Sequence, residues 1–272
     1  HRHYPEIEKL SDRYFLFLQK VIATQASLIA HWMDIGFIHG VMNTDNMLIS
    51  GETIDFGPCA FMDHFNFNQV FSSIDRNGRY SFINQPPIAQ WNLARLADCL
   101  LMLVENDSSV VKMFEHELAK FQALFQGHWL QRMSSKLGLL NELPQDLEII
   151  KNWLKYIEAE KLDYTISFKK LADSLDADRA VGDFELQWRE RLKAQPFDFQ
   201  AVKNKMNQVN PIYIPRNHQV ERAIQSAVAG DMSVFNEMVQ VLKNPFTEQP
   251  GFEIYKAAPR PEEQVCATFC GT

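Results

Sequence analysis

Three oxygen-bearing side chains lie close together in residues 38–57, IHGVMNTDNMLISGETIDFG. Asp45 and Asn46 are adjacent, and Asp55 opens the tripeptide Asp-Phe-Gly nine residues after Asn46. Mg²⁺ prefers hard oxygen ligands and is usually held by a few protein groups together with phosphate oxygens and water. The spacing therefore predicts that Asn46 and Asp55 converge on a divalent metal ion. Asp45 is expected to point elsewhere and to orient or deprotonate a hydroxyl nucleophile.

Two short apolar runs are predicted to hold these side chains in place. The runs MLIS (47–50) and TIDF (53–56) are separated by Gly-Glu, which indicates a small hairpin or two short strands. Residues 8–33 predict an amphipathic helix before them, because apolar side chains recur at steps of three and four. His39, between this helix and the loop, is expected to pack and to hydrogen-bond the loop backbone.

The rest of the chain is predicted to be mostly helical, after a turn-rich loop over residues 64–90. Helices are expected over residues 88–105, 109–126, 144–160, 165–175, 183–193, 197–208, 218–229 and 231–243. Strands and helices do not alternate regularly, so a doubly wound α/β sheet is not expected. The predicted fold class is mainly α (α+β), with one small β-hairpin beside the candidate site.

Composition limits the partners that the chain can have. The 272 residues carry a formal net charge of −7, which argues against general binding to nucleic acid or anionic membranes. No apolar run approaches the roughly 18 residues of a membrane-spanning helix, and no secretory signal is visible. The chain opens with HRHYPEIEKL and lacks an initial Met, so it is interpreted as part of a longer protein.

The 4 cysteines show no zinc-binding spacing. Cys99, in the run LADCLLML, is expected to be a small core residue. Cys266 and Cys270 lie near the C-terminus, where a redox or pairing role and a merely tolerated thiol both remain open.

The order of these features fits a template for nucleotide-dependent transfer. In protein kinases a catalytic-loop Asp accepts the substrate proton, an Asn holds one metal ion, and the Asp of Asp-Phe-Gly holds the other. Small-molecule kinases show a related pattern of His-Gly-Asp, four residues and Asn, which His39, Gly40 and Asn46 match. Val41 stands where the catalytic Asp is expected, and valine cannot accept a proton. Either the protein is a dead kinase, or Asp45 takes that role in a different arrangement.

Neighbouring residues have plainer interpretations. Asp63 is expected to stabilise a loop in preference to contacting substrate. Arg95 is expected to have a structural role on the helix that follows the double proline. Met42 and Met47 are expected in the core.

Longer phrases resemble a single family. These phrases occur in one order along the chain and together resemble the selenoprotein O family, also called the YdiU or UPF0061 family. In order they are HGVMNTDNM, TIDFGP, FMD, GRYSFINQPPIAQWNLARLA and NPIYIPRNHQVERAI. The resemblance runs from RHYPEI at residues 2–7 to the terminal FCGT. It implies a protein-kinase-like fold with a flipped ATP, and transfer of AMP, not phosphate, to Ser, Thr or Tyr hydroxyls of proteins.

The resemblance also implies roles for single residues. Asn46 and Asp55 match the family's metal ligands, for Mg²⁺ or Mn²⁺, and thereby contribute to binding the ATP co-substrate. Asp45 matches the proposed catalytic base. Cys270 matches a position that is selenocysteine in some animal members, and its redox role and its pairing with Cys59 stay open.

In the family, the Gly-rich loop and the Lys and Arg residues that hold the phosphates precede the segment that matches RHYPEI. Residues 1–105 are thus interpreted as a kinase-like C-lobe core, 106–244 as its helical remainder and extension, and 245–272 as a tail, with the N-lobe absent. The isolated chain is expected to transfer AMP poorly or not at all. The expected location is the cytoplasm for a bacterial protein and the mitochondrion for a eukaryotic one.

Two other functions remain open at this point. One is phosphoryl transfer to a protein or small molecule, against which Val41 weighs. The other is a non-catalytic pseudokinase that binds partners, whose binding would survive replacement of Asp55 by Ala.

Overall fold

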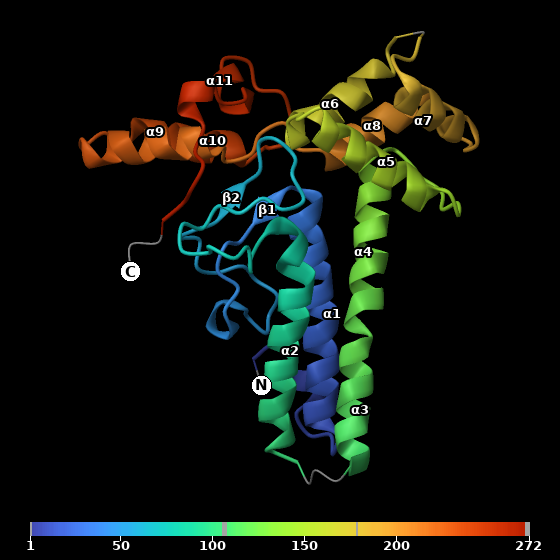
Figure 1. The fold of residues 1–272 in the computed structure, drawn as a ribbon, viewed down its shortest axis with the longest axis vertical. Coiled ribbons are helices and arrows are strands. Elements are labelled where there is room, and N and C mark those ends of the chain that lie inside the picture. Colours follow the sequence, from blue (N-terminus) through green and yellow to red (C-terminus); the bar gives the residue numbers. More distant parts are fainter. Residues whose placement is uncertain (1, 105–107, 178, 270–272) are drawn as a thin grey trace.

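The structure, a computed structural model, describes residues 2–104, 108–177 and 179–269. Three helices lie side by side and run roughly vertically in Figure 1: α1 (Arg13–Asp34), α2 (Gln85–Leu101) and α4 (Phe121–Lys136). Helix α3 (Ser108–Ala119) lies below α4 in the same view. The segment between α1 and α2 lies beside these helices and carries the candidate site (Figure 1).

Helix α1 confirms the amphipathic pattern read from the sequence. Leu18, Ile22 and Ile29 lie on its inner face and are fully buried, and burying such aliphatic side chains stabilises the fold by about 1.5–3 kcal/mol each. The helix begins five residues later than the predicted range, at Arg13, after a short 3-10 turn, η1 (Pro5–Ile7).

The remaining helices lie in the upper half of Figure 1 and follow the predicted ranges to within two residues at each end. They are α5 (Asp146–Ala159), α6 (Tyr164–Ser174), α7 (Asp183–Lys193), α8 (Phe199–Val209), α9 (Asn217–Val228) and α10 (Ser233–Leu242). Two of them have clear start signals, because Asp163 accepts a hydrogen bond from Ile166 N and Asp198 accepts one from Ala201 N. Short helical turns η2 (Thr44–Asn46), η3 (Phe82–Asn84), α11 (Glu253–Lys256) and η4 (Pro261–Glu263) complete the set for the described residues.

Two helix predictions need correction. The single helix expected over residues 109–126 is two helices, α3 and α4, which are separated at Lys120, and α4 continues to Lys136. The helix expected over 88–105 begins earlier, at Gln85. Pro86 and Pro87 fall in its first turn, where the missing backbone N–H has no intrahelical partner to lose.

A small sheet lies at the candidate site, but its strands are not the predicted ones. Strand β1 (Phe37–Ile38) pairs antiparallel with β2 (Ala60–Phe61), with Phe37 opposite Phe61. The predicted pairing of MLIS with TIDF is reduced to one isolated bridge, between Met47 and Thr53. The loop is therefore closed at its base by β1 and β2 and at its outer end by that bridge.

The described residues form two hydrophobic cores. The larger one includes residues from Leu18 in α1 to Met206 in α8, on both sides of residue 105. The smaller one joins α9, α10 and α11 through residues such as Ala223, Val241 and Tyr255. The division of the chain at residues 105 and 245 stays a prediction. Within the described ranges, no helix combines the length and the apolar character needed to cross a membrane.

Cys99 is not a core residue, so that prediction was wrong. Its neighbours Ala97 and Leu100 are buried, whereas Cys99 lies on an exposed side of α2. The apolar run CLLMLV is also less buried than its composition suggests, because the helix ends at Leu101 and the Met102 side chain is 83% exposed. An unbroken apolar run covers more of a helix surface than the stripe that faces the core.

Candidate active site

Asn46 and Asp55 are brought together, as their spacing predicted. Asn46 Nδ2 donates a hydrogen bond of 2.8 Å to Asp55 Oδ2 and another of 3.1 Å to the carbonyl oxygen of Val41. Asn46 ends the 3-10 turn η2, and Asp55 follows the outer bridge of the loop. The two residues that the sequence singles out for metal binding are therefore in contact at the surface, where Asp55 is exposed and Asn46 is half-buried.

Asp55 adopts a backbone conformation that L residues seldom use. Its φ is +56°, and only Lys161 shares a positive φ among the described non-glycine residues. Asp and Asn tolerate this left-handed region better than most other residues. The turn directs the exposed carboxylate toward Asn46. Gly40 also has a positive φ, and a Cβ there would lie 2.7 Å from the carbonyl oxygen of Pro58, so only glycine fits this approach.

His39 packs beneath the loop and hydrogen-bonds its backbone, as predicted. The ring is buried, its Nε2 lies 2.8 Å from the carbonyl oxygen of Ile54, and Val41 N donates to Nδ1 over 3.3 Å. This pairing requires a neutral ring that carries its proton on Nε2. Desolvation lowers the pKa of His39 below its usual value, against the opposing effects of the Ile54 carbonyl and Asp55. His39 therefore positions the residue before Asp55.

Gln85, which the sequence analysis missed, fixes the base of the loop. Its side chain is fully buried; Oε1 accepts from His39 N and Nε2 donates to the carbonyl oxygen of Phe37, each over 3.0 Å. The available signal was a polar residue directly before Pro86-Pro87 at a helix start. The amide thereby ties α2 to β1 and to His39.

Two further amides hold the loop that carries Asn46 and Asp55 from the neighbouring helices. Asn92 Nδ2, on α2, donates to the carbonyl oxygen of Met42 over 2.9 Å. Gln25 Nε2, on α1, donates to the carbonyl oxygen of Leu48 over 2.6 Å. Met42 is buried, as predicted, whereas Met47 is only half-buried at the edge of the core.

Asp45 is exposed, and its carboxylate has no hydrogen-bond partner within the described ranges. It lies between Thr44 and Asn46 in η2, and Tyr80 braces the start of this turn by donating to Asn43 Oδ1 over 2.7 Å. Its exposed position leaves it open to an incoming hydroxyl group. Arg95 instead forms an ion pair of 3.1 Å with Asp98 on its own helix, which agrees with a structural role.

Asp63 has the structural role that was expected of it. Arg216 is fully buried, and its Nη1 lies 2.5 Å from Asp63 Oδ1 and 2.8 Å from Asp163 Oδ2. Its Nε also donates to the carbonyl oxygen of Lys256 over 3.1 Å. This cluster fastens the segment that follows Asp-Phe-Gly to α6, α9 and α11.

The C-terminal segment also contacts the segment after Asp-Phe-Gly. Thr268 forms a parallel bridge with Ser72, and its hydroxyl donates to the carbonyl oxygen of Pro58 over 2.5 Å. Cys59 is half-buried, and burial raises the pKa of its thiol to about 11, so it is protonated near neutral pH. Cys266 is exposed. Cys270 lies outside the described residues, and its predicted redox role and pairing with Cys59 stay predictions.

The free oxygens of the site fit a hard divalent cation. Asn46 uses its amide nitrogen for Val41 and Asp55, so its Oδ1 and Asp55 Oδ1 have no hydrogen-bond partner among the residues described. Amide and carboxylate oxygens are ligands that Mg²⁺ and Mn²⁺ accept. No cluster of 3 or more His, Cys, Asp or Glu occurs in the described ranges. The donor set therefore fits a metal whose coordination is completed by phosphate and water.

Comparison with known proteins points in the same direction. The family model described as protein adenylyltransferase SelO matches residues 1–243. A protein named protein nucleotidyltransferase YdiU from Rhizobium johnstonii is 46% identical over the whole chain, which covers 57% of that relative. Relatives of the same name from Rhizobium meliloti and Rhodopseudomonas palustris (strain BisB5) are 45% and 46% identical, again over the whole chain and 58% of their own length. The chain thus spans little more than half the length of these curated relatives.

Proposed function

The chain belongs to the SelO family, and from this premise we propose that it forms the metal-binding and acceptor side of an enzyme that transfers AMP from ATP to hydroxyl groups of proteins. The observation that carries the proposal is the contact of 2.8 Å between Asn46 and Asp55. The name protein nucleotidyltransferase, carried by the relatives, supports nucleotidyl transfer as the reaction class.

Asn46 Oδ1 and Asp55 Oδ1 are the oxygens that would hold Mg²⁺ or Mn²⁺. A divalent ion held there would supply positive charge that offsets the negative charge developing on the phosphates of ATP. The chain's own contribution is to fix the two oxygens. The carbonyl oxygen of Val41 accepts a hydrogen bond from Asn46. His39 hydrogen-bonds the carbonyl oxygen of Ile54, the residue before Asp55.

Asp45 would receive the proton of the acceptor hydroxyl group. The hydroxyl oxygen of a Ser, Thr or Tyr side chain forms a bond to the α-phosphorus of ATP, the bond from that phosphorus to the β-phosphate oxygen breaks, and pyrophosphate leaves. The proton passes from the hydroxyl group to the Asp45 carboxylate. The exposure of Asp45 and its position beside Asn46 support this role. Val41 is buried and apolar, so it has no part in proton transfer.

A protein-kinase-like C-lobe is the fold that we propose for this arrangement. Its support is the order of elements: a long helix α1, a loop with Asn46, a turn with Asp55, and a buried helix α2 that holds the loop through Gln85 and Asn92. The same order appears in the template of metal-dependent phosphoryl transfer.

The test has two arms. The first measures Mn²⁺ binding to this chain by electron paramagnetic resonance, with wild type compared with Asp55→Asn. The second uses ATP labelled on the α-phosphate with the full-length Rhizobium johnstonii relative, with its counterparts of Asp45 and Asp55 replaced in turn. We expect label transfer to protein that both replacements abolish, and a modified residue whose added mass is that of AMP and not of phosphate.

Loss of transfer in only one variant, or a product with the mass of phosphate, would overturn the proposed reaction. The same relative also separates an enzyme from a binding module, because a pseudokinase would retain partner binding and show no transfer.

A further inference from the structure

An exposed tryptophan on α2 lies against two arginine side chains. Trp91 is 44% exposed. The guanidinium carbon of Arg79, in the segment before α2, lies 5.0 Å from the centre of the Trp91 ring, and that of Arg95 lies 5.4 Å from the same centre. We call Arg79, Trp91 and Arg95, which are all exposed, the arginine–tryptophan cluster. Tryptophan and arginine are enriched among the residues that carry binding energy at protein interfaces.

Arg79 has a fixed backbone and an unpaired side chain. The two carboxylate oxygens of Asp75 accept hydrogen bonds from this backbone, one from Arg79 N and one from Tyr80 N, each over 2.8 Å. Asp75 therefore holds the turn. Among the described residues the guanidinium group of Arg79 has no hydrogen-bond or ion-pair partner, and it lies over the rings of Tyr80 and Trp91. Its N–H groups are free to pair with an incoming anion.

Tyr80 connects the cluster to the turn that presents Asp45. The guanidinium carbon of Arg79 lies 5.7 Å from the centre of the Tyr80 ring. At the other end of this side chain, the Tyr80 hydroxyl donates to Asn43 Oδ1 over 2.7 Å, at the start of η2. A single side chain thus spans the distance between the cluster and the turn.

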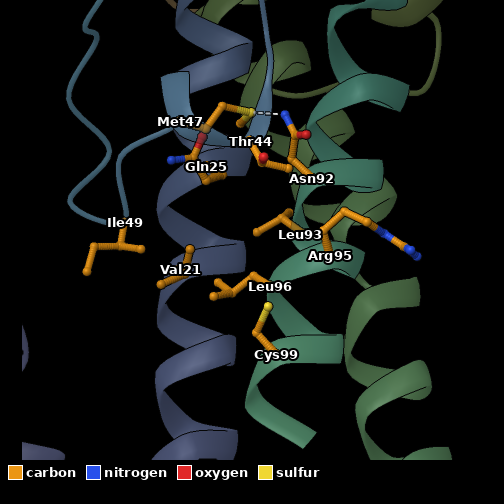
Figure 2. A pocket seen from close by; sticks show the side chains of 10 residues that line it. All are labelled: Val21, Gln25, Thr44, Met47, Ile49, Asn92, Leu93, Arg95, Leu96 and Cys99. Atoms are coloured by element: carbon orange, nitrogen blue, oxygen red, sulfur yellow. Dashed lines mark hydrogen bonds between the residues drawn. The ribbon is translucent and has the colours of Figure 1, made fainter. Parts of the chain in front are cut away.

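Helix α2 makes a second connection to the turn. Asn92 follows Trp91, and its Nδ2 lies 2.6 Å from Met47 Sδ, the dashed line in Figure 2. Arg95 lines a cavity of about 270 Å³ together with Thr44, the first residue of η2 (Figure 2). The arginine–tryptophan cluster therefore adjoins η2 along α2 as well as through Tyr80.

From these contacts we propose that the arginine–tryptophan cluster binds a carboxylate side chain, Asp or Glu, of the acceptor protein, a few residues away from the hydroxyl group that receives AMP. This inference rests on the proposed function, because it places that hydroxyl group at Asp45. The guanidinium group of Arg79 pairs with the carboxylate through two parallel N–H···O hydrogen bonds. The exposed ring of Trp91 packs against the acceptor chain.

Arg95 adds a second guanidinium group that can change its partner. Its ion pair with Asp98 spans 3.1 Å between side chains that are 49% and 59% exposed. Such surface pairs contribute little to stability. A carboxylate that arrives beside Trp91 therefore competes with Asp98 for Arg95 at small cost.

Charge favours an acidic protein segment over nucleic acid. The chain carries a formal net charge of −7, which opposes a polyanion that extends over its surface. A single carboxylate needs only the local positive charge of Arg79 and Arg95. The cluster is thus matched to an isolated acidic side chain.

Two short peptides test the proposal by fluorescence anisotropy with this chain. Both carry a fluorophore and a central Ser; one has two Glu residues on each side of the Ser, and the other has Gln at these places. We expect the Glu peptide to bind about tenfold more tightly, which corresponds to about 1.4 kcal/mol. The difference should shrink as salt screens the charges.

Three outcomes of this titration would overturn the proposal. The first is equal affinity of the two peptides, and the second is a difference that high salt leaves unchanged. The third is tighter binding of a single-stranded oligothymidylate than of the Glu peptide, which would assign the cluster to nucleic acid.

Arg79→Ala and Arg76→Ala separate the cluster from general positive charge. Arg76 is exposed in the same segment and lies over no aromatic ring within the described part of the chain. We expect Arg79→Ala to lose most of the preference for Glu over Gln, and Arg76→Ala to retain it. Equal losses in the two variants would contradict the assigned site.

Two further variants give readouts that a merely structural role would not move. Arg79→Glu should reverse the preference, so that a peptide with Lys in place of Glu binds more tightly than the Glu peptide. Retained preference for Glu in this variant would overturn the proposal. Asp98→Asn removes the carboxylate that competes for Arg95 and should tighten binding of the Glu peptide by about twofold. Unchanged affinity would contradict the part assigned to Arg95.

Failure of this proposal can be told apart from failure of the proposed function, because peptide binding needs neither ATP nor metal. A preference for Glu in this chain, without AMP transfer by the full-length Rhizobium johnstonii relative, leaves a carboxylate-binding site and overturns the proposed function. Transfer by the relative, without a preference for Glu in this chain, overturns the recognition site and leaves the proposed function standing.

Discussion

The amide nitrogen of Asn46 lies 2.8 Å from Asp55 Oδ2, although the two residues are nine positions apart on opposite sides of the loop. The same nitrogen lies 3.1 Å from the carbonyl oxygen of Val41. The nitrogen is used twice within the protein, and the side-chain oxygen of Asn46 and the second carboxylate oxygen of Asp55 have no hydrogen-bond partner among the described residues. One hydrogen bond thus holds together the two side chains whose remaining oxygens we propose as metal ligands.

Replacement of Asp55 by Asn should abolish most divalent-metal binding and leave the fold intact. Asn tolerates the positive φ of +56° at this position and keeps the shape of the side chain, but it removes the negative charge. We expect Mn²⁺ affinity to fall by about tenfold or more, which corresponds to about 1.4 kcal/mol. Asp98→Asn is the control, because it removes an exposed carboxylate whose ion-pair partner among the described residues is Arg95. Equal loss of Mn²⁺ binding in both variants would contradict the metal role of Asp55.

Replacement of Asn46 by Asp should make folding depend on metal. It converts the hydrogen bond of 2.8 Å to Asp55 into contact between two carboxylates, and like charges at this distance repel. We expect the free energy of unfolding to fall by about 1–3 kcal/mol without metal and to recover when Mn²⁺ is added. Thermal unfolding followed by circular dichroism measures both states.

Asn43→Asp serves as the control for added charge. It introduces the same negative charge in the same loop and retains an oxygen that can accept from Tyr80. We expect its stability to change little with Mn²⁺. A similar metal-dependent recovery in Asn43→Asp would show that general charge, and not contact with Asp55, causes the effect.

The sequence predicted the parts of the site that depend on local spacing. Asn46 and Asp55 belong to one short loop, and His39 lies only a few residues before it, so their meeting follows from a small number of turn and strand rules. The structure confirms that they converge, while their role as metal ligands stays a prediction. The helices from α5 to α10 were also predictable, because each has its own periodic apolar face.

The parts that were missed depend on contacts between distant segments. Gln85 reaches Phe37 across 48 positions, and Arg216 reaches Asp63 across 153 positions. No local sequence pattern indicates hydrogen-bond partners that lie so far apart along the chain. Strands β1 and β2 contain two residues each, which is too short for alternation to be visible in the sequence. Cys99 was misjudged because an apolar neighbourhood along the chain does not fix which side of a helix faces the core.

Protonation of His39 should destabilise the chain as the pH falls. Burial lowers the pKa of His39 in the folded state, so the unfolded chain binds more protons between that lowered value and the ordinary value of 6.5. The free energy of unfolding therefore rises with pH in this window and is lost as the pH falls through it. We expect His39→Gln to show a flatter dependence in urea unfolding between about pH 5 and 6.5. His218→Gln is the control, because His218 is less buried and its pKa is also lowered. If both variants change the pH dependence of the free energy of unfolding equally, the larger effect predicted for His39 is contradicted.

Removal of the buried charge at Lys136 should stabilise the protein near neutral pH. Lys136 lies with its ammonium group 4.2 Å from the centre of the Phe168 ring, and burial lowers its pKa from 10.5 to about 8. Between pH 8 and 10.5 the unfolded chain binds more protons than the folded chain. The buried charge therefore lowers the free energy of unfolding by its full amount below pH 8, and this loss disappears as the pH rises toward 10.5. We expect Lys136→Met to gain about 2–3 kcal/mol at pH 7, less the cation–π contact of about 1 kcal/mol.

The pH dependence distinguishes this mechanism from better packing. The gain in Lys136→Met should shrink as the pH rises from 7 to about 9.5, whereas a packing effect would remain constant. Lys151→Met, at an exposed position of α5, should change stability by less than about 0.5 kcal/mol. A constant gain across this range would exclude the buried charge as its cause.

Loss of Arg216 should separate the segment after Asp-Phe-Gly from the C-terminal helices. Arg216 Nη1 lies 2.5 Å from Asp63 and 2.8 Å from Asp163, and its removal leaves two carboxylates without their cation in a buried place. Arg216→Met should therefore reduce the free energy of unfolding by about 3–5 kcal/mol.

Burial already raises the pKa of Asp63, and loss of Arg216 removes the main charge that opposes this shift. A carboxyl group with a raised pKa costs more stability as the pH rises, so the loss in Arg216→Met should be smaller at about pH 5 than at pH 7. Arg95→Met provides the control, because its exposed ion pair with Asp98 contributes at most about 1 kcal/mol. Chemical denaturation at the two pH values measures the free energy of unfolding of both variants. Equal losses of stability in Arg216→Met and Arg95→Met would show that the buried cluster does not hold the two segments together.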